Sequence, residues 1–103
     1  MSEALDKFRF RVEKSPENLF FRFSYAQFLS DSNQFKEAIE QLDFCLSKRP
    51  DWMMASLLKA KLEIKLGRDS DAVSSLLKTI ELAEVQDHDG PLKEAKDILG
   101  TLI

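Results

Sequence analysis

Apolar side chains recur along this chain with the spacing of one face of an α-helix. Near the N-terminus, Ala4, Leu5, Phe8 and Val12 lie at offsets of one, four and eight residues, which places them on a single helical stripe. Similar stripes, separated by short turns, predict helices over residues 17–31, 35–48, 51–66, 69–85 and 91–102. The pattern therefore indicates an all-α protein built from amphipathic helices.

The stripes repeat at a fixed interval. Ala4, Ala38 and Ala72 are each separated by 34 residues, and an aliphatic residue follows each of them. Pro16 and Pro50 are separated by the same interval, as are Asn33 and Gly67, residue types that end helices or accept a left-handed backbone. Such a period predicts stacked helix–turn–helix units, that is, a short α-solenoid of antiparallel helix hairpins with about five helices.

The period also predicts the organisation of the chain. At 103 residues the length suits one domain, covering residues 1–103. Within it we expect a half repeat at residues 2–16, a first repeat at 19–52, a second at 53–86 and a capping helix at 90–102. The capping helix would cover the otherwise open end of the stack.

The columns resemble those of the tetratricopeptide repeat family, whose pattern is W-x₂-L-G-x₂-Y, then A-x₃-F, then P. In the first repeat, the matching positions hold Arg22, Tyr25, Ala26, Leu29, Ala38, Leu42 and Pro50. The second repeat keeps Ala60, Gly67 and Ala72, but Ser56, Lys59 and Glu63 stand where the family buries Trp, Leu and Tyr. The whole arrangement resembles small bacterial two-repeat proteins of this family.

The resemblance implies a concave groove lined by the first helix of each repeat, where family members bind their partners. The implied groove residues are Phe20, Phe23, Ser24, Gln27 and Asp31 in the first repeat and Met54, Leu57, Leu58, Lys61, Ile64 and Lys65 in the second. We therefore expect a protein-interaction module or adaptor that binds a peptide or a partner helix. Phe23, Gln27 and Leu58 occupy the positions of the family's carboxylate clamp, so binding of heat-shock chaperone tails is not expected.

Three alternatives remain open at this point. The helix at 51–66 is polar where the family is apolar, so it is either in the family's orientation or rotated, with Leu57, Leu58 and Ile64 in the core. The apolar groove either receives a partner or pairs with a second copy as a homodimer. Lys61 and Lys65, with Lys93 and Lys96 of the last helix, form either a solvated face or a site for an acidic ligand.

Composition and charge narrow the function. The net charge of −3 argues against a nucleic-acid partner, and no apolar run approaches the roughly 20 residues of a membrane span. The acidic N-terminal segment lacks a signal-peptide pattern, which favours a cytoplasmic location. Cys45 lies on an apolar stripe and His88 lies between two aspartates in a turn, so neither indicates a nucleophile or a metal site. We expect no enzyme activity, metal or cofactor.

Overall fold

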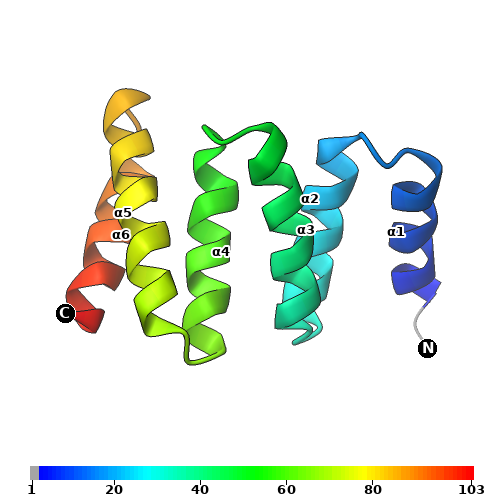
Figure 1. Cartoon of the computed structure of the whole chain (residues 1–103), viewed down its shortest axis with the longest axis horizontal. Coiled ribbons are helices and arrows are strands. Elements are labelled where there is room, and N and C mark those ends of the chain that lie inside the picture. The colour runs from blue at the N-terminus through cyan, green and yellow to red at the C-terminus, as the bar shows by residue number, and fades with distance from the viewer. Residues whose placement is uncertain (1–2) are drawn as a thin grey trace.

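The computed structural model describes residues 3–103, which form six α-helices and no strands (Figure 1). In chain order they are α1 (Glu3–Lys14), α2 (Leu19–Asp31), α3 (Phe35–Lys48), α4 (Met53–Lys65), α5 (Asp69–Val85) and α6 (Asp89–Leu102). The all-α expectation is confirmed, with one helix more than the approximate number predicted. Ser2, the first residue of the predicted half repeat, lies outside the described residues.

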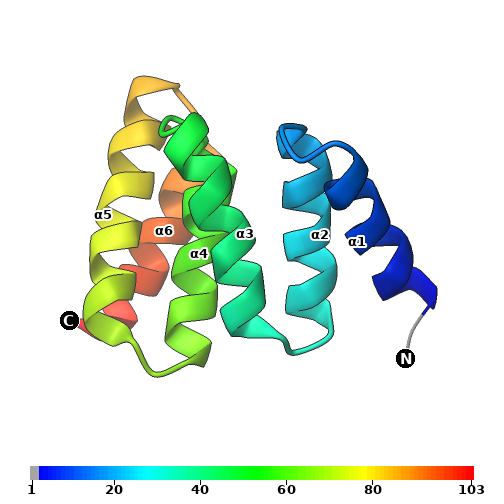
Figure 2. The ribbon, with the colours of Figure 1, turned by 45° about the vertical axis from the view of Figure 1, so that its right-hand side comes forward.

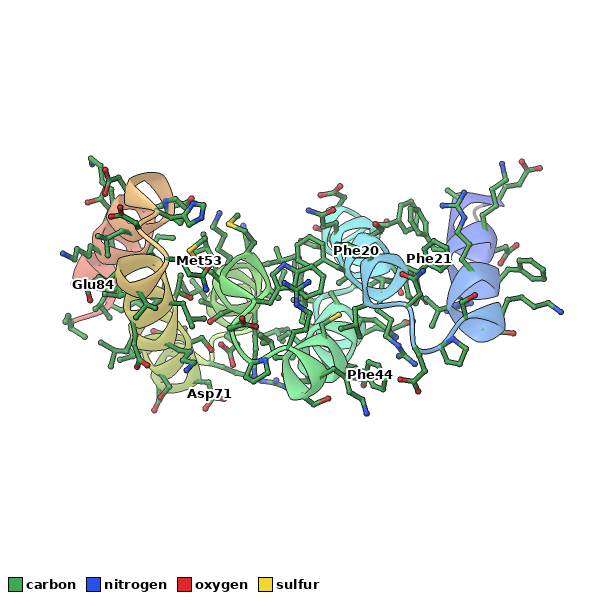
Figure 3. All side chains as sticks on the ribbon, turned by 90° about the horizontal axis from the view of Figure 1, so that it is seen from above. Phe20, Phe21, Phe44, Met53, Asp71 and Glu84 are labelled. Carbon is green, nitrogen blue, oxygen red and sulfur yellow. The ribbon has the colours of Figure 1, made fainter. Side chains whose placement is uncertain are left out.

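The helices follow one another in an elongated stack, with α1 beside α2 at one end and α6 beside α5 at the other (Figures 1 and 2). The stack measures 39 × 27 × 20 Å. Each internal helix packs on more than one neighbour, since α3 contacts both α2 and α4, and α5 contacts both α4 and α6. Phe20 of α2 and Phe44 of α3 point to opposite sides of the stack (Figure 3).

Four alanines of the repeat pattern are fully buried at the contacts between helices. Ala26, Ala38, Ala60 and Ala72 have no exposed surface, and a larger side chain at these positions would push the helix axes apart. The column that defines the repeat is thus buried at Ala38 and Ala72, while Ala4 in the terminal helix α1 is half-buried. The 34-residue pattern therefore marks the helix contacts of the stack.

The two predicted hairpin turns share one backbone geometry. Asn33 (φ 61°) and Gly67 (φ 73°) adopt the left-handed conformation, and the residue after each of them donates a backbone hydrogen bond to the carbonyl five positions before the donor. These bonds run from Gln34 N to Leu29 O and from Arg68 N to Glu63 O, both 2.8 Å long. Such bonds satisfy carbonyls that the helix end leaves unpaired.

The connection between α5 and α6 uses the same turn. Asp87 has φ 61°, and His88 N donates to Ala83 O at 2.9 Å. Glu84 occupies the position that Pro50 holds one period earlier, so nothing interrupts the helix there and α5 continues to Val85. Helix α5 is therefore 17 residues long, against 14 for α3. After the turn at Asp87, α6 packs against α5.

Candidate functional site

Most of the side chains predicted to line a groove form one stripe on α2 and one on α4. On α2 the stripe holds Phe20, Phe23 and Gln27, and on α4 it holds Met54, Leu58, Lys61 and Lys65. Phe20 is 67% exposed and Met54 is 44% exposed, whereas Phe23, Leu58 and Lys61 are half-buried. Gln27 and Lys65 are exposed. The surface between α2 and α4, here called the groove, is therefore apolar along much of its length.

One end of the groove is aromatic. The Trp52 ring stacks on Phe23 with ring centroids 4.8 Å apart, and it meets Phe20 edge-on at 5.8 Å. The guanidinium carbon of Arg49 lies 4.8 Å from the centre of the Trp52 ring. Sequence reasoning missed Trp52 and Arg49, although a lone tryptophan directly after the Pro50 turn was an available signal. We call Phe20, Phe23, Trp52 and Arg49 the aromatic end.

The other end of the groove is a polar-rimmed depression of about 340 Å³. Its lining comes from the end of α2, the start of α3 and the second half of α4: Ser30, Asp31, Asn33, Phe35, Leu58, Lys61, Leu62 and Lys65. Leu58 is the floor residue that this depression shares with the rest of the groove. The predicted residues Leu58, Lys61 and Lys65 are thus brought together in one place.

Leu57 is a correction to the predicted site. It is only 1% exposed and packs with Ala60, Leu76 and Ala95, so its side chain belongs to the core and not to the groove surface. The reason is α6, which covers this face of α4. Ile64 is half-buried and does not line the depression.

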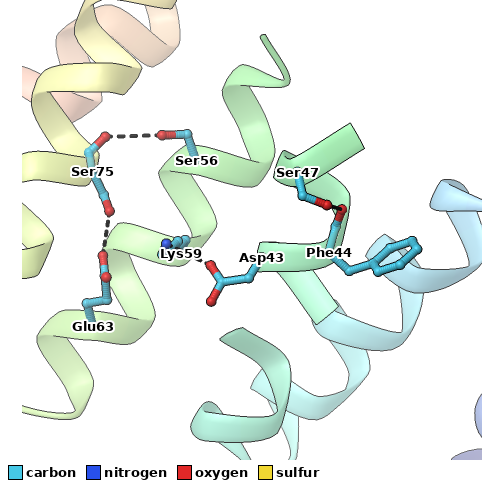
Figure 4. Close-up of polar contacts among 7 residues, drawn as sticks. All are labelled: Asp43, Phe44, Ser47, Ser56, Lys59, Glu63 and Ser75. Atoms are coloured by element: carbon cyan, nitrogen blue, oxygen red, sulfur yellow. Dashed lines mark hydrogen bonds and ion pairs between the residues drawn. The ribbon is translucent and has the colours of Figure 1, made fainter. Parts of the chain in front are cut away.

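The polar face of α4 is buried against α5. Ser56 is 3% and Glu63 5% exposed, and both reach α5 through hydrogen bonds. Ser56 Oγ donates to the Ser75 carbonyl at 3.1 Å, and Ser75 Oγ donates to Glu63 Oε1 at 2.6 Å (Figure 4). Ser56 and Glu63 thus keep the positions facing the hairpin partner, so the rotated-helix alternative is wrong in its register, although it was right that Leu57 is core.

Comparison with known proteins addresses the fold. No family model matches the sequence, and no curated protein matches it. Solved structures do. A tetratricopeptide repeat domain protein from Salinibacter ruber superposes with a TM-score of 0.77 at 24% identity, covering 85% of this chain and 89% of that one.

Two further structures superpose more completely. The TPR2B domain of yeast Sti1, in its pHsp70 complex, gives a TM-score of 0.85 at 18% identity and covers 96% of this chain and 79% of its own. A protein from Bordetella parapertussis gives 0.85 at 19% identity, covering 99% and 89%. The fold is the tetratricopeptide-repeat fold. Identities this low establish the architecture alone.

The lysines around the tetratricopeptide-repeat groove do not form a free cluster. Lys61 forms an ion pair with Glu94 of α6, and Lys93 pairs with Asp97 at 2.8 Å. The bond to Asp97 raises the pKa of Lys93. Two of the four amines considered for an acidic ligand are therefore already neutralised by carboxylates of α6, which leaves Lys65 as the exposed amine on the rim of the depression.

Cys45, the one cysteine of the sequence, is part of the core of the tetratricopeptide-repeat fold. Cys45 has no exposed surface, and its thiol donates a 3.6 Å hydrogen bond to the Leu19 carbonyl. Burial raises the pKa of this thiol, which disfavours the reactive thiolate. Within residues 3–103, no three potential metal ligands from His, Cys, Asp and Glu gather at one place, and no helix is long and apolar enough to cross a membrane.

Proposed function

We propose that this chain is a protein-interaction module whose groove binds a peptide or helical segment of a partner protein. The observation that carries the proposal is the exposed apolar stripe of Phe20 and Met54 above the half-buried Phe23 and Leu58. Exposed apolar side chains that gather on one face of a folded protein often mark a binding surface. Two helices that face each other across this stripe offer a shallow channel of the kind that receives amphipathic segments.

The fold supports the same proposal. The TPR2B domain of yeast Sti1, which shares this architecture, has been solved in a complex with pHsp70. A peptide or protein ligand for the present chain is consistent with that precedent for the fold. We expect a different partner for this chain, because Phe23 and Leu58 make its groove apolar.

The proposal is tested with a charge placed in the groove and a matched charge placed outside it. Met54→Glu puts a carboxylate on the apolar stripe in the first turn of α4, where an acidic residue is compatible with the helix dipole. Leu77→Glu puts the same group on α5 at a leucine that is 54% exposed. Random peptides of about 12 residues, long enough to span the groove as a helix, are selected on the parent protein by display.

We expect Met54→Glu to lose most of the selected binders and Leu77→Glu to keep them. Equal binding by both variants would show that the groove is not the binding surface. Self-association through the groove, the alternative interpretation, gives a different result in the same proteins. In that case light scattering shows a dimer for the parent and for Leu77→Glu, but a monomer for Met54→Glu.

A further inference from the structure

The aromatic end of the groove carries one exposed cation that no carboxylate neutralises. Arg49 lies on the face of Trp52, and no ion pair among residues 3–103 involves it, even though Asp51 is two positions away. Lys61, a cation at the other end of the groove, forms an ion pair with Glu94. The aromatic end thus combines a large apolar surface with an unneutralised positive charge.

The guanidinium of Arg49 lies over a ring that is itself packed against two phenylalanines. The Trp52 ring stacks on Phe23 and meets Phe20 edge-on. These contacts orient the indole face on which Arg49 lies. The N–H groups of a guanidinium lie in its own plane, so they can still donate hydrogen bonds when its face stacks on an aromatic ring. This geometry suits bidentate binding of a carboxylate. Phe20, 67% exposed, offers an apolar surface beside that plane.

From this arrangement we infer that the partner is a peptide with an acidic residue next to an aromatic or aliphatic one. Its carboxylate binds Arg49, and the neighbouring apolar side chain packs on Phe20 and Trp52. The inference rests on the proposed groove-binding function and adds the chemistry of the ligand. The charge sets specificity, because a basic residue at the same place would meet Arg49 unfavourably.

The experiment sorts display-selected peptides by their dependence on two arginines. Peptides that bind the parent protein but not Met54→Glu are retained as groove binders. Their affinities are then measured for Arg49→Gln and for the control Arg68→Gln, which removes an exposed arginine at the start of α5. Trp52 is the single tryptophan of the chain, so its fluorescence reports occupancy of the aromatic end directly.

We expect the groove binders to carry Asp or Glu next to an apolar residue. Arg49→Gln should weaken them about five- to tenfold, the size of a charge-assisted hydrogen bond at an exposed site, while Arg68→Gln leaves them unchanged. Selection on Arg49→Glu should instead enrich peptides with Lys or Arg at that place, which tests the inference without relying on the neutral variant.

The other outcomes are equally decisive. Groove binders that lack an acidic residue, or that bind Arg49→Gln as tightly as the parent, would overturn the inference while leaving the proposed function in place. Absence of any peptide that distinguishes the parent from Met54→Glu would reject the proposed function itself. Circular dichroism melting of each variant, compared with the parent, verifies that the scaffold is intact.

Discussion

Ser75 donates a 2.6 Å hydrogen bond to the carboxylate of Glu63 across the contact between α4 and α5. Ser56 extends this contact by donating to the Ser75 carbonyl, and Thr79 Oγ1 lies 2.9 Å from Ser56 Oγ (Figure 4 shows the first two links). Hydrogen bonds therefore join the second hairpin at positions where the repeat pattern has large apolar residues. No buried side-chain nitrogen or oxygen of the described residues lacks a partner.

Removing one member of this network should destabilise the protein. Ser75→Ala leaves the Glu63 carboxylate, which is only 5% exposed, without its donor, and this costs about 1–3 kcal/mol of unfolding free energy. Urea unfolding followed by circular dichroism measures the change. The control is Ser74→Ala, which deletes the same hydroxyl from the exposed neighbour on α5 and should change the free energy by no more than a few tenths of a kcal/mol.

Replacing both partners has the opposite expectation. Adding Glu63→Leu to Ser75→Ala removes the unpaired carboxylate and restores an apolar residue where the repeat pattern has one, so most of the lost stability should return. A double variant less stable than Ser75→Ala alone would show that the site has no room for the apolar side chain.

The sequence predicted the scaffold because its signals are local. The stripe of Ala38 and Leu42 and the left-handed residues Asn33 and Gly67 act within one helix or one turn, so a single period locates them. The groove was predicted less completely. Leu57 became core because α6 covers it, and the placement of that helix depends on the turn at Asp87, where the period no longer applies.

The aromatic end was missed for a related reason. Trp52 and Arg49 lie at the boundary between two repeats, outside both helices of the hairpin. Their importance comes from contacts with Phe20 and Phe23 on a helix about 30 residues earlier, and one sequence shows no spacing that pairs them. Likewise, the sequence alone shows Ser56 and Glu63 only as departures from the repeat pattern, because their hydrogen-bond partners lie on α5.

A larger residue in the alanine column should strain the stack. Ala38 is fully buried between helices, so Ala38→Leu forces side chains or backbone to move and should lower the unfolding free energy by about 1–3 kcal/mol. Glu40→Leu introduces the same side chain on the exposed side of α3 and serves as the control. If the two variants unfold at the same urea concentration, the close approach of the helices at Ala38 is wrong.

Gly67 should be intolerant of alanine although it has space for one. No atom lies within 4 Å of the position that a Cβ would occupy, so the penalty comes from the left-handed backbone alone and should be about 1–2 kcal/mol. Gly100 also has open space around it but lies in α6 without a positive φ. Gly100→Ala should therefore stabilise the protein by about 0.5–1 kcal/mol. Thermal melting distinguishes these opposite signs, and Gly67→Ala melting at or above the parent temperature would contradict the turn geometry.

Tyr25 links the first three helices through its hydroxyl. It donates to Glu37 Oε2 at 2.6 Å and accepts from Arg9 Nε at 3.1 Å. Burial raises the pKa of Tyr25, and the bond to the Glu37 carboxylate raises it further, because both favour the neutral phenol. Tyr25→Phe should consequently cost about 1 kcal/mol at neutral pH, and its effect should be largest on the attachment of α1.

The raised pKa fixes how stability depends on pH. Below pH 10.0, the ordinary pKa of tyrosine, the phenol is protonated in both the folded and the unfolded chain, so its contribution is fully present. Above that pH the unfolded chain ionises first, and the contribution of Tyr25 is lost as the pH rises through the folded pKa.

The Cys45 pKa is raised in the same direction, so the comparison is made in a Cys45→Ala background. There, the stability difference between Tyr25 and Tyr25→Phe should shrink above pH 10.0, and tyrosinate absorbance should appear at higher pH in the native protein than in urea. Since the chain has one tyrosine, that absorbance is unambiguous, and identical titration curves in the two solvents would contradict the buried hydrogen bond to Glu37.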